Sequence, residues 1–167
     1  MSEKLYPVMV RLKGKKVVIV GGGKIAYRKV KGLIDTGAII EIISPQILPT
    51  LKNMTEIHWI EKEFSPNDIK DAQIVFAATN SKTVNQQVVL ACNENQFVND
   101  VSESTHSTFM NMAVVEQGSV KIAISTQGES PQLAKEIKKE IEDTINPSYI
   151  EKVNQYKQRR KKHERDN

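Results

Sequence analysis

The stretch Val17-Val18-Ile19-Val20-Gly21-Gly22-Gly23-Lys24-Ile25-Ala26 determines the fold that we predict for this chain. Its first four residues are all apolar, which is typical of a strand buried on both faces of a sheet. The remainder matches the pattern G-x-G-x-x-A, which opens a helix directly after a strand. The N-terminus of such a helix offers unpaired N–H groups and a partial positive charge to phosphates. We therefore predict a dinucleotide-binding turn at Gly21, Gly22 and Gly23.

The small residues of this turn have different predicted tasks. Gly21 permits the tight strand-to-helix turn, Gly23 has no Cβ to obstruct a diphosphate, and Ala26 lets the helix lie close to the sheet. Lys24 and Arg28 either assist the phosphates or face water. The pattern G-x-x-x-x-G-K-[ST] does not occur, which argues against a P-loop nucleotide site.

Apolar runs alternate with helical patterns through the first part of the chain. Because strands joined by helices of this length are linked by right-handed crossovers, the pattern predicts a parallel sheet. The fold class expected is α/β, a Rossmann-type doubly wound parallel sheet. We predict strands at 17–20, 39–43, 57–60, 74–78 and 97–101, with helices at 24–36 (C-cap Gly37) and 82–94.

The pattern changes after residue 108. The runs Met112–Val115 and Val120–Ile124, separated by Gln117-Gly118-Ser119, predict a β-hairpin. Ser130-Pro131 then predicts a helix that begins with a serine N-cap and runs to about Ile145. The polar remainder is expected to be a short C-terminal helical segment. The domains expected are a NAD-binding Rossmann domain (1–108), a hairpin-plus-helix dimerisation region (109–146) and a basic helical tail (147–167), which resembles a truncated helical domain.

Composition is that of an ordinary globular protein, with 39% hydrophobic and 26% charged residues. No apolar run reaches the roughly 18–20 residues needed to span a bilayer, and residues 1–5 lack the pattern of a secretory signal. The single cysteine, Cys92, cannot form an internal disulfide, and we expect it to be a small buried residue on a helix. The expected location is therefore cytoplasmic.

The net charge of +4 is concentrated near the C-terminus, in the run Lys157-Gln158-Arg159-Arg160-Lys161-Lys162. Such a run binds nucleic acid or acidic lipid in some proteins, and in others it is a solvated helix end whose cations suit the helix dipole. No recognisable nucleic-acid-binding fold precedes it. We therefore expect neither a nucleic-acid nor a membrane partner.

Seven stretches of the chain form a distinctive set: residues 6–10, 12–15, Val20–Ala26 with Arg28-Lys29, Gly37-Ala38, Ser44-Pro45, Ala77–Asn80 with Val84-Asn85, and Ile124–Pro131. Together they resemble the precorrin-2 dehydrogenase family, the N-terminal module of siroheme synthases. The resemblance implies transfer of hydride from precorrin-2 to NAD, giving sirohydrochlorin on the route to siroheme. Some members of the family also insert iron, and the family is typically a homodimer in which the hairpin and following helix meet their mates.

The resemblance also implies which residues bind the cofactor. Lys24, Ile25, Pro45 and Gln46 would line the dinucleotide, and Thr79-Asn80 would lie near its nicotinamide end. Ser44 stands where an acid usually closes the second strand of such a fold. A serine can bind a ribose hydroxyl, but it neither repels a 2′-phosphate nor pairs with one. NAD is the expected cofactor, and the sequence leaves the choice against NADP open.

The candidate catalytic residues follow the fifth strand. Many family members carry an aspartate, thought to be catalytic, three residues after an asparagine that closes this strand, and here Ser102 occupies that place after Asn99. Asp100 is the first candidate for the base, although it could instead be a strand-end residue bonded to backbone N–H groups. His106 is the second candidate, or else an exposed loop histidine. His58, His106 and His163 show no ligand spacing, so no metal site is expected.

A different class of function is also compatible with the glycine turn. A dinucleotide-sensing regulatory Rossmann module would bind the same cofactor and use the basic C-terminal helix to dock on a partner. The stretch Ser125–Pro131 has no evident purpose in such a sensor. The sequence therefore favours the dehydrogenase.

Overall fold

The computed structural model describes residues 4–163, and side chains as far as residue 160. The chain divides into two compact units, an N-terminal unit (Met1–Met110) and a C-terminal unit (Asn111–Asn167), which are described separately below. The predicted tail 147–167 and its basic run thus lie partly outside the described residues. Within the described part, no helix has the length and apolar character needed to cross a membrane.

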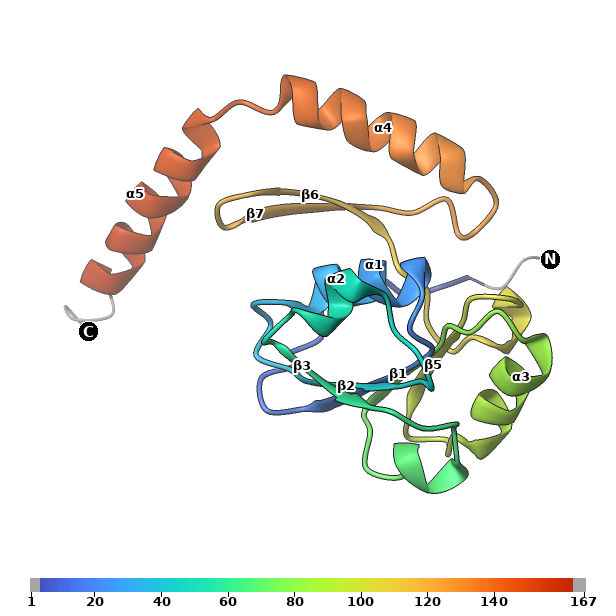
Figure 1. The fold of residues 1–167 in the computed structure, drawn as a ribbon. Helices are drawn as coiled ribbons and strands as arrows, with labels where there is room; N and C mark the ends of the chain where they lie inside the picture. Colours follow the sequence, from blue (N-terminus) through green and yellow to red (C-terminus); the bar gives the residue numbers. More distant parts are fainter. Residues whose placement is uncertain (1–3, 164–167) are drawn as a thin grey trace. The chain divides into compact units, whose positions relative to one another are not determined.

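The N-terminal unit is built on a five-stranded parallel sheet (Figure 1). Its strand order is β3-β2-β1-β4-β5, so the chain moves outward from β1 to one edge and then returns to build the other half. This arrangement confirms the predicted doubly wound α/β fold. The strands are β1 (Lys16–Val20), β2 (Ile39–Ile43), β3 (Ile57–Ile60), β4 (Ile74–Ala77) and β5 (Phe97–Asp100).

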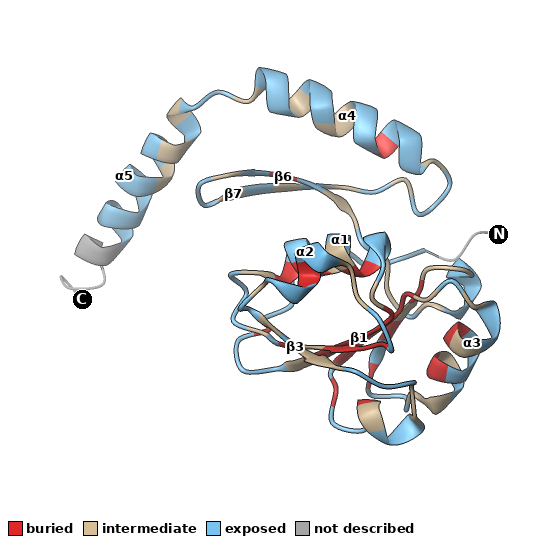
Figure 2. Ribbon diagram, viewed as in Figure 1, coloured by how far each residue is buried: buried red, intermediate tan, exposed pale blue. Residues whose placement is uncertain are grey.

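The strand β1 is buried because both faces of the sheet carry a hydrophobic core. Val17 and Ile19 pack in a core that includes Ala26 and Val30 of helix α1, whereas Val18 and Val20 pack in a second core with Val88 of helix α3. Figure 2 shows the buried residues concentrated in these central strands. Alternating residues point to opposite faces of a strand, so a strand covered on both sides reads as a continuous apolar run. The helical elements are α1 (Lys24–Leu33), α2 (Pro49–Lys52), α3 (Lys82–Ala91) and the 3₁₀ turns η1 (Pro66–Ile69) and η2 (Ser104–His106).

Helix α1 is shorter than predicted, and Gly37 is not its C-cap. The helix ends at Leu33 because Thr36 donates its hydroxyl to the Leu33 carbonyl at 2.6 Å, and Asp35 takes the left-handed conformation with φ 68°. Gly37 instead forms the turn before β2, where its carbonyl accepts the Gly14 N–H at 2.8 Å.

Helix α3 also ends earlier than predicted, at Ala91 rather than residue 94. The backbone N–H of Asn93 donates to Gln96 Oε1 at 2.9 Å and therefore does not continue the helical hydrogen bonds. Cys92 is therefore the C-cap, and its half-buried thiol donates to the Val88 carbonyl at 3.3 Å. Burial raises the pKa of the Cys92 thiol to about 11, so it is a poor nucleophile.

The C-terminal unit contains an antiparallel hairpin and two helices. The predicted hairpin is present but tighter than expected, because β6 (Ala113–Gln117) extends to Gln117 and leaves Gly118-Ser119 as the turn before β7 (Val120–Ile124). Helix α4 (Pro131–Thr144) has the predicted N-cap, since the Ser130 hydroxyl accepts the Leu133 N–H at 3.2 Å. Helix α5 (Ser148–His163) follows. Among the described side chains of this unit, Val115 and Ala134 alone are buried.

Candidate active site

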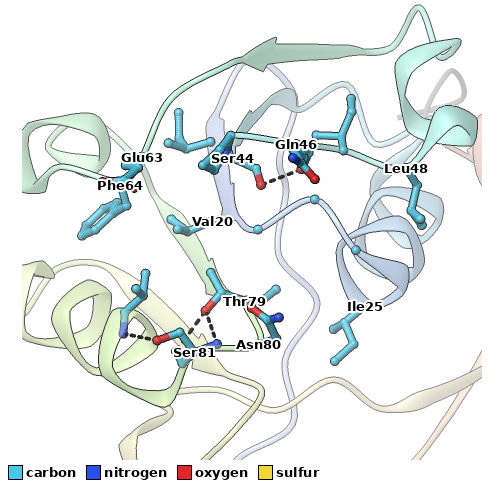
Figure 3. A pocket seen from close by; sticks show the side chains of 18 of the residues that line it. Val20, Ile25, Ser44, Gln46, Leu48, Glu63, Phe64, Thr79, Asn80 and Ser81 are labelled. Atoms are coloured by element: carbon cyan, nitrogen blue, oxygen red, sulfur yellow. Dashed lines mark hydrogen bonds between the residues drawn. The ribbon is translucent and has the colours of Figure 1, made fainter.

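A cavity of about 770 Å³ opens at the carboxyl edge of the parallel sheet, where the loops after β1, β2, β3 and β4 meet (Figure 3). Parallel strands bring such loops to one edge, and ligands of doubly wound folds bind there. All the residues predicted to bind the cofactor line this cavity. They are Gly21, Gly22, Gly23, Lys24, Ile25, Ser44, Pro45, Gln46, Thr79 and Asn80.

The first two glycines are required by the packing of the loops. Gly21 has φ 118°, and a Cβ there would lie 2.7 Å from the carbonyl carbon of Ala78. A Cβ on Gly22 would lie 2.8 Å from the Cα of Ile47, so the loop after β2 can approach only a bare backbone. The sequence assigned the turn to Gly21 and gave Gly22 no separate task.

Gly23 is different, because a Cβ there would meet no protein atom within 4 Å. The packing of the fold therefore does not require a glycine at this position, and the missing side chain keeps space open in the cavity. Gly23 is the N-cap of α1, and no side chain caps the N–H groups that follow. An uncapped helix start beside a cavity is suited to bind an anion.

Hydrogen bonds hold the loop after β2 in place and leave the Ser44 hydroxyl free only to accept a further hydrogen bond. The Ser44 hydroxyl donates to the Gln46 carbonyl at 2.7 Å, and the Ser44 carbonyl accepts the Trp59 indole N–H at 2.9 Å. Leu48 donates its N–H to the Gly22 carbonyl at 2.9 Å and ties this loop to the glycine turn. Since its proton is used, the Ser44 hydroxyl is left as an acceptor toward a ligand.

The loop after β4 is built around a fully buried asparagine, Asn85. Its Oδ1 accepts the Thr79 N–H at 3.0 Å and lies 2.7 Å from Thr79 Oγ1. Ser81 caps α3 by accepting the Val84 N–H at 3.3 Å. The Asn85 side chain is therefore structural, and it fixes the backbone that presents Thr79 and Asn80 to the cavity.

The cavity includes several residues that the sequence analysis missed. Glu63 and Phe64 follow β3, and Ser81, Val84 and Gln87 belong to the N-terminal part of α3. No motif marks Glu63, Phe64, Ser81 or Gln87, whereas Val84 belongs to a stretch that carries the family resemblance. The signal available was topological, since the loop after the third strand must reach the same sheet edge as the glycine turn.

The three candidate catalytic residues form a separate cluster at the end of β5 and in the loop that follows, and they do not line the cavity. Asp100 Oδ1 accepts the Ser102 N–H at 2.8 Å and the Ser102 hydroxyl at 2.7 Å, and Asp100 Oδ2 lies 3.5 Å from His106 Nδ1. The Asp100 side chain is 2% exposed and the His106 side chain is 40% exposed. Among the described residues, no group of three or more His, Cys, Asp or Glu side chains lies close enough to hold a metal ion.

The charge of Asp100 is stabilised inside this cluster. Burial by itself raises the pKa of Asp100, but hydrogen bonds from Ser102, His106 and the Glu103 backbone together lower it below its ordinary value. The carboxylate is thus ionised at neutral pH, and a carboxylate held in this way is a weak base. This bonding matches the structural alternative for Asp100 more closely than a role as proton acceptor.

A lysine on α1 supports the segment that carries this cluster. Lys29 Nζ donates to Asn99 Oδ1 at 2.8 Å and lies 4.8 Å from the centroid of the Phe76 ring. The Asn99 amide donates in turn to the Phe109 carbonyl at 3.1 Å. Ser107 accepts the Asp100 N–H at 2.9 Å, so the segment 99–109 is bonded at both ends. Burial lowers the pKa of Lys29 from 10.5 to about 8.

Comparison with known proteins places this geometry in a family. Residues 8–113 match a family described as NAD(P)-binding, and residues 117–144 match one described as the central part of sirohaem biosynthesis proteins. Precorrin-2 dehydrogenase of Bacillus subtilis (strain 168) is 35% identical over 162 residues, which cover 95% of this chain and 100% of that protein. The chain belongs to the precorrin-2 dehydrogenase and siroheme synthase N-terminal family.

Other members of this family extend beyond the matched region. The precorrin-2 dehydrogenase of Priestia megaterium is 31% identical, and the match covers 88% of this chain and 74% of that protein. The siroheme synthase of Photorhabdus laumondii is 32% identical, and the match covers 85% of this chain but 31% of that protein. The solved structure of SirC, a precorrin-2 dehydrogenase, superimposes with a TM-score of 0.80 at 31% identity, covering 90% of this chain and 76% of that chain.

The buried Lys29 predicts a pH dependence of stability. Between pH about 8 and 10.5 the folded state loses the Lys29 proton while the unfolded state keeps it, so the free energy of unfolding rises with pH across this window. Denaturant titrations of the wild type and Lys29→Met at several pH values measure the effect. We expect the free energy of unfolding of the wild type, relative to that of Lys29→Met, to increase as pH rises. Taking this difference cancels contributions common to both proteins, such as the opposing one of Cys92. A constant difference across this window would contradict the assignment.

Proposed function

We propose that this chain is an NAD-dependent precorrin-2 dehydrogenase that binds its cofactor in the cavity at the carboxyl edge of the sheet. The chain matches a protein of this activity over that protein's whole length, and the family is NAD(P)-binding. The observation that carries the proposal is the uncapped start of α1, which faces a cavity lined by every residue expected to bind a dinucleotide.

The described residues fit a dinucleotide in that cavity. The N–H groups at the start of α1 and the Lys24 side chain would hold the diphosphate, and the open space at Gly23 would admit it. The loops after β2 and β4 would hold its two nucleoside halves. When bound, the nicotinamide accepts a hydride from the substrate. The task of this chain is then to orient the cofactor and to remove the accompanying proton.

We propose His106 as the group that accepts that proton, with Asp100 and Ser102 as its supports. The Asp100 carboxylate already receives donors from Ser102, whereas His106 is partly exposed. The contact of His106 Nδ1 with Asp100 leaves Nε2 available to a substrate. A histidine oriented by a buried carboxylate is a common arrangement for a general base. The Ser102 hydroxyl is committed to Asp100 as a donor, so its role is to position that carboxylate.

We also propose a homodimer formed through the C-terminal unit. This unit buries Val115 and Ala134 alone among its described side chains, while Val114 is 39% and Leu133 46% exposed. A two-stranded hairpin is at best marginally stable without an additional packed layer. A second copy of the same unit would cover these apolar side chains, as the resemblance to a dimeric family implies.

The first prediction of this proposal distinguishes glycines needed for NAD binding from glycines needed for folding. Gly23→Val is expected to remain folded because a Cβ there meets no protein atom within 4 Å, and to weaken NAD binding at least about 100-fold, or about 2.8 kcal/mol, by occupying the diphosphate space. Gly21→Ala is expected to cost about 2 kcal/mol of stability or more, through its positive φ and the clash with Ala78. Gly32→Ala, on the exposed side of α1, is the control and should gain about 0.5–1 kcal/mol.

Calorimetry with NAD, denaturant titration and NADH absorbance with precorrin-2 measure these effects. Undiminished NAD affinity in a folded Gly23→Val protein would refute the site. A wild type that binds NAD but gives no NADH with precorrin-2 would instead favour the sensor class of function.

The second prediction concerns the proton acceptor. His106→Gln is expected to lower kcat at least about 100-fold, the usual contribution of a general base, with little change in the KM for NAD. His58→Gln replaces an exposed histidine of β3 and is the matched control. Wild-type turnover by His106→Gln would place the base elsewhere.

The third prediction concerns the oligomer. Sedimentation velocity of the wild type at micromolar concentration is expected to give a dimer, and the double substitution Val114→Ser with Leu133→Ser is expected to shift it toward monomer because apolar burial is lost. Leu90→Ser, which changes a leucine of α3 that is 80% exposed, should leave the dimer intact. A wild-type monomer would overturn the proposal.

A further inference from the structure

We propose that Glu63 selects NAD over NADP by accepting a hydrogen bond from the adenosine ribose at the far end of the cavity. This inference deepens the proposed function and depends on it. It assigns to the loop after β3 a task that the end of β2 performs in most proteins of this fold. The choice between the two cofactors is then set by a residue outside any recognised motif.

The first step is that the end of β2 cannot discriminate. Ser44 occupies the position of the usual acid, and its hydroxyl donates to the Gln46 carbonyl at 2.7 Å. It can accept a hydrogen bond from a ribose hydroxyl, but it carries no charge to repel a 2′-phosphate. Pro45 and Gln46, which follow it in the cavity wall, are uncharged as well.

The second step is the distribution of charge in the cavity. Among the described residues that line it, Lys24 and Glu63 are the two that are charged at neutral pH. Lys24 lies at the start of α1, where the diphosphate would bind. Glu63 follows β3, which lies beyond β2 in the sheet, and Figure 3 shows it on the side of Ser44 and away from Ile25. The adenosine ribose of a doubly wound fold lies beyond the end of β2, on this same side.

The third step is that the backbone at Glu63 is held while its carboxylate remains available. Phe64 packs against the second core, and the Ser65 N–H donates to Asp68 Oδ2 at 2.8 Å. The neighbouring cation Lys62 is bound to Asp68 at 2.7 Å, so it does not neutralise Glu63. Within residues 4–163, Glu63 makes no hydrogen bond or ion pair of its own.

The fourth step is the surroundings of this carboxylate. Phe64, which follows Glu63 in the chain, is half-buried and gives the same end of the cavity an apolar wall (Figure 3). An apolar wall with a polar group at its margin suits a purine ring. Glu63 thus lies beside the part of the cavity that best fits the adenosine half of the cofactor.

The chemistry of the two cofactors differs at one group. NAD presents a 2′-hydroxyl, which donates to a carboxylate in a charge-assisted hydrogen bond. NADP presents a phosphate monoester with a charge of about −1.5 to −2 near neutral pH, which a carboxylate repels. A carboxylate at this place therefore favours NAD twice, by attraction of one ligand and repulsion of the other.

The test compares NAD and NADP as ligands of the full chain by calorimetry, and as cosubstrates with precorrin-2. The wild type is expected to favour NAD by at least about tenfold in Kd. Glu63→Gln should reduce this preference about tenfold by restoring NADP binding, and Glu63→Lys should bring the two affinities close together or reverse them. Glu61→Gln removes the same charge from an exposed residue that does not line the cavity, and should leave the preference unchanged.

The outcomes separate this inference from the proposed function. A wild type that binds neither NAD nor NADP would refute the proposal that the cavity binds the cofactor. A wild type that binds NAD but shows the same affinity for NADP, or a Glu63→Gln protein with an unchanged preference, would overturn the role of Glu63 and leave the dehydrogenase standing. If Glu61→Gln changed the preference as much as Glu63→Gln, the cause would be overall charge, and the role of Glu63 would again be overturned.

Discussion

The structure of the N-terminal unit depends on two glycines, Gly21 and Gly22, whose bare backbone fits between the loops that follow β2 and β4. Gly21 lies against the carbonyl of Ala78, and Gly22 lies against the backbone of Ile47. The loops that follow β2 and β4 can therefore converge on the end of β1, and their convergence encloses the cavity. With any side chain at these two positions the loops would have to separate, and the hydrogen bond from Leu48 to Gly22 would be lost. Gly23 has no such neighbour, so its lack of a side chain keeps space open in the cavity.

Helix α1 links the two parts of the candidate site. Its first residues line the cavity, and one turn later Lys29 bonds to Asn99 at the end of β5. Asn99 and Ser107 hold the segment that carries Asp100 and His106. The helix thus sets the position of the cofactor end and of the candidate proton acceptor through a single rigid element. Holding a cation in a half-buried place is costly, and the retention of Lys29 is consistent with a positional task, because an uncharged donor would bond Asn99 less strongly.

Much of the fold could be predicted because its signals are local. The unbroken apolar run 17–20 indicated a strand covered on both faces, and the residues expected at the cofactor from the glycine spacing and the family resemblance all line one cavity. The end of α1 was wrong because the sequence analysis gave weight to Gly37 and overlooked Thr36, whose hydroxyl closes the helix three residues earlier. Interactions across the sheet left no local signal. Lys29 and Asn99 are 70 residues apart, and nothing in either neighbourhood indicates the other.

The same distinction explains why the catalytic cluster was harder to predict than the cofactor site. A cofactor site of this fold is made largely of backbone, so glycine spacing reveals it. A proton acceptor is a side chain whose basicity depends on its partners, and for Asp100 these partners are two groups of Ser102 and the ring of His106. The sequence placed all three within seven residues but could not tell which would be buried. Hydrogen bonds to the buried Asp100 lower the pKa of its carboxyl and make it a weak base, which is why we propose the more exposed His106 as the proton acceptor.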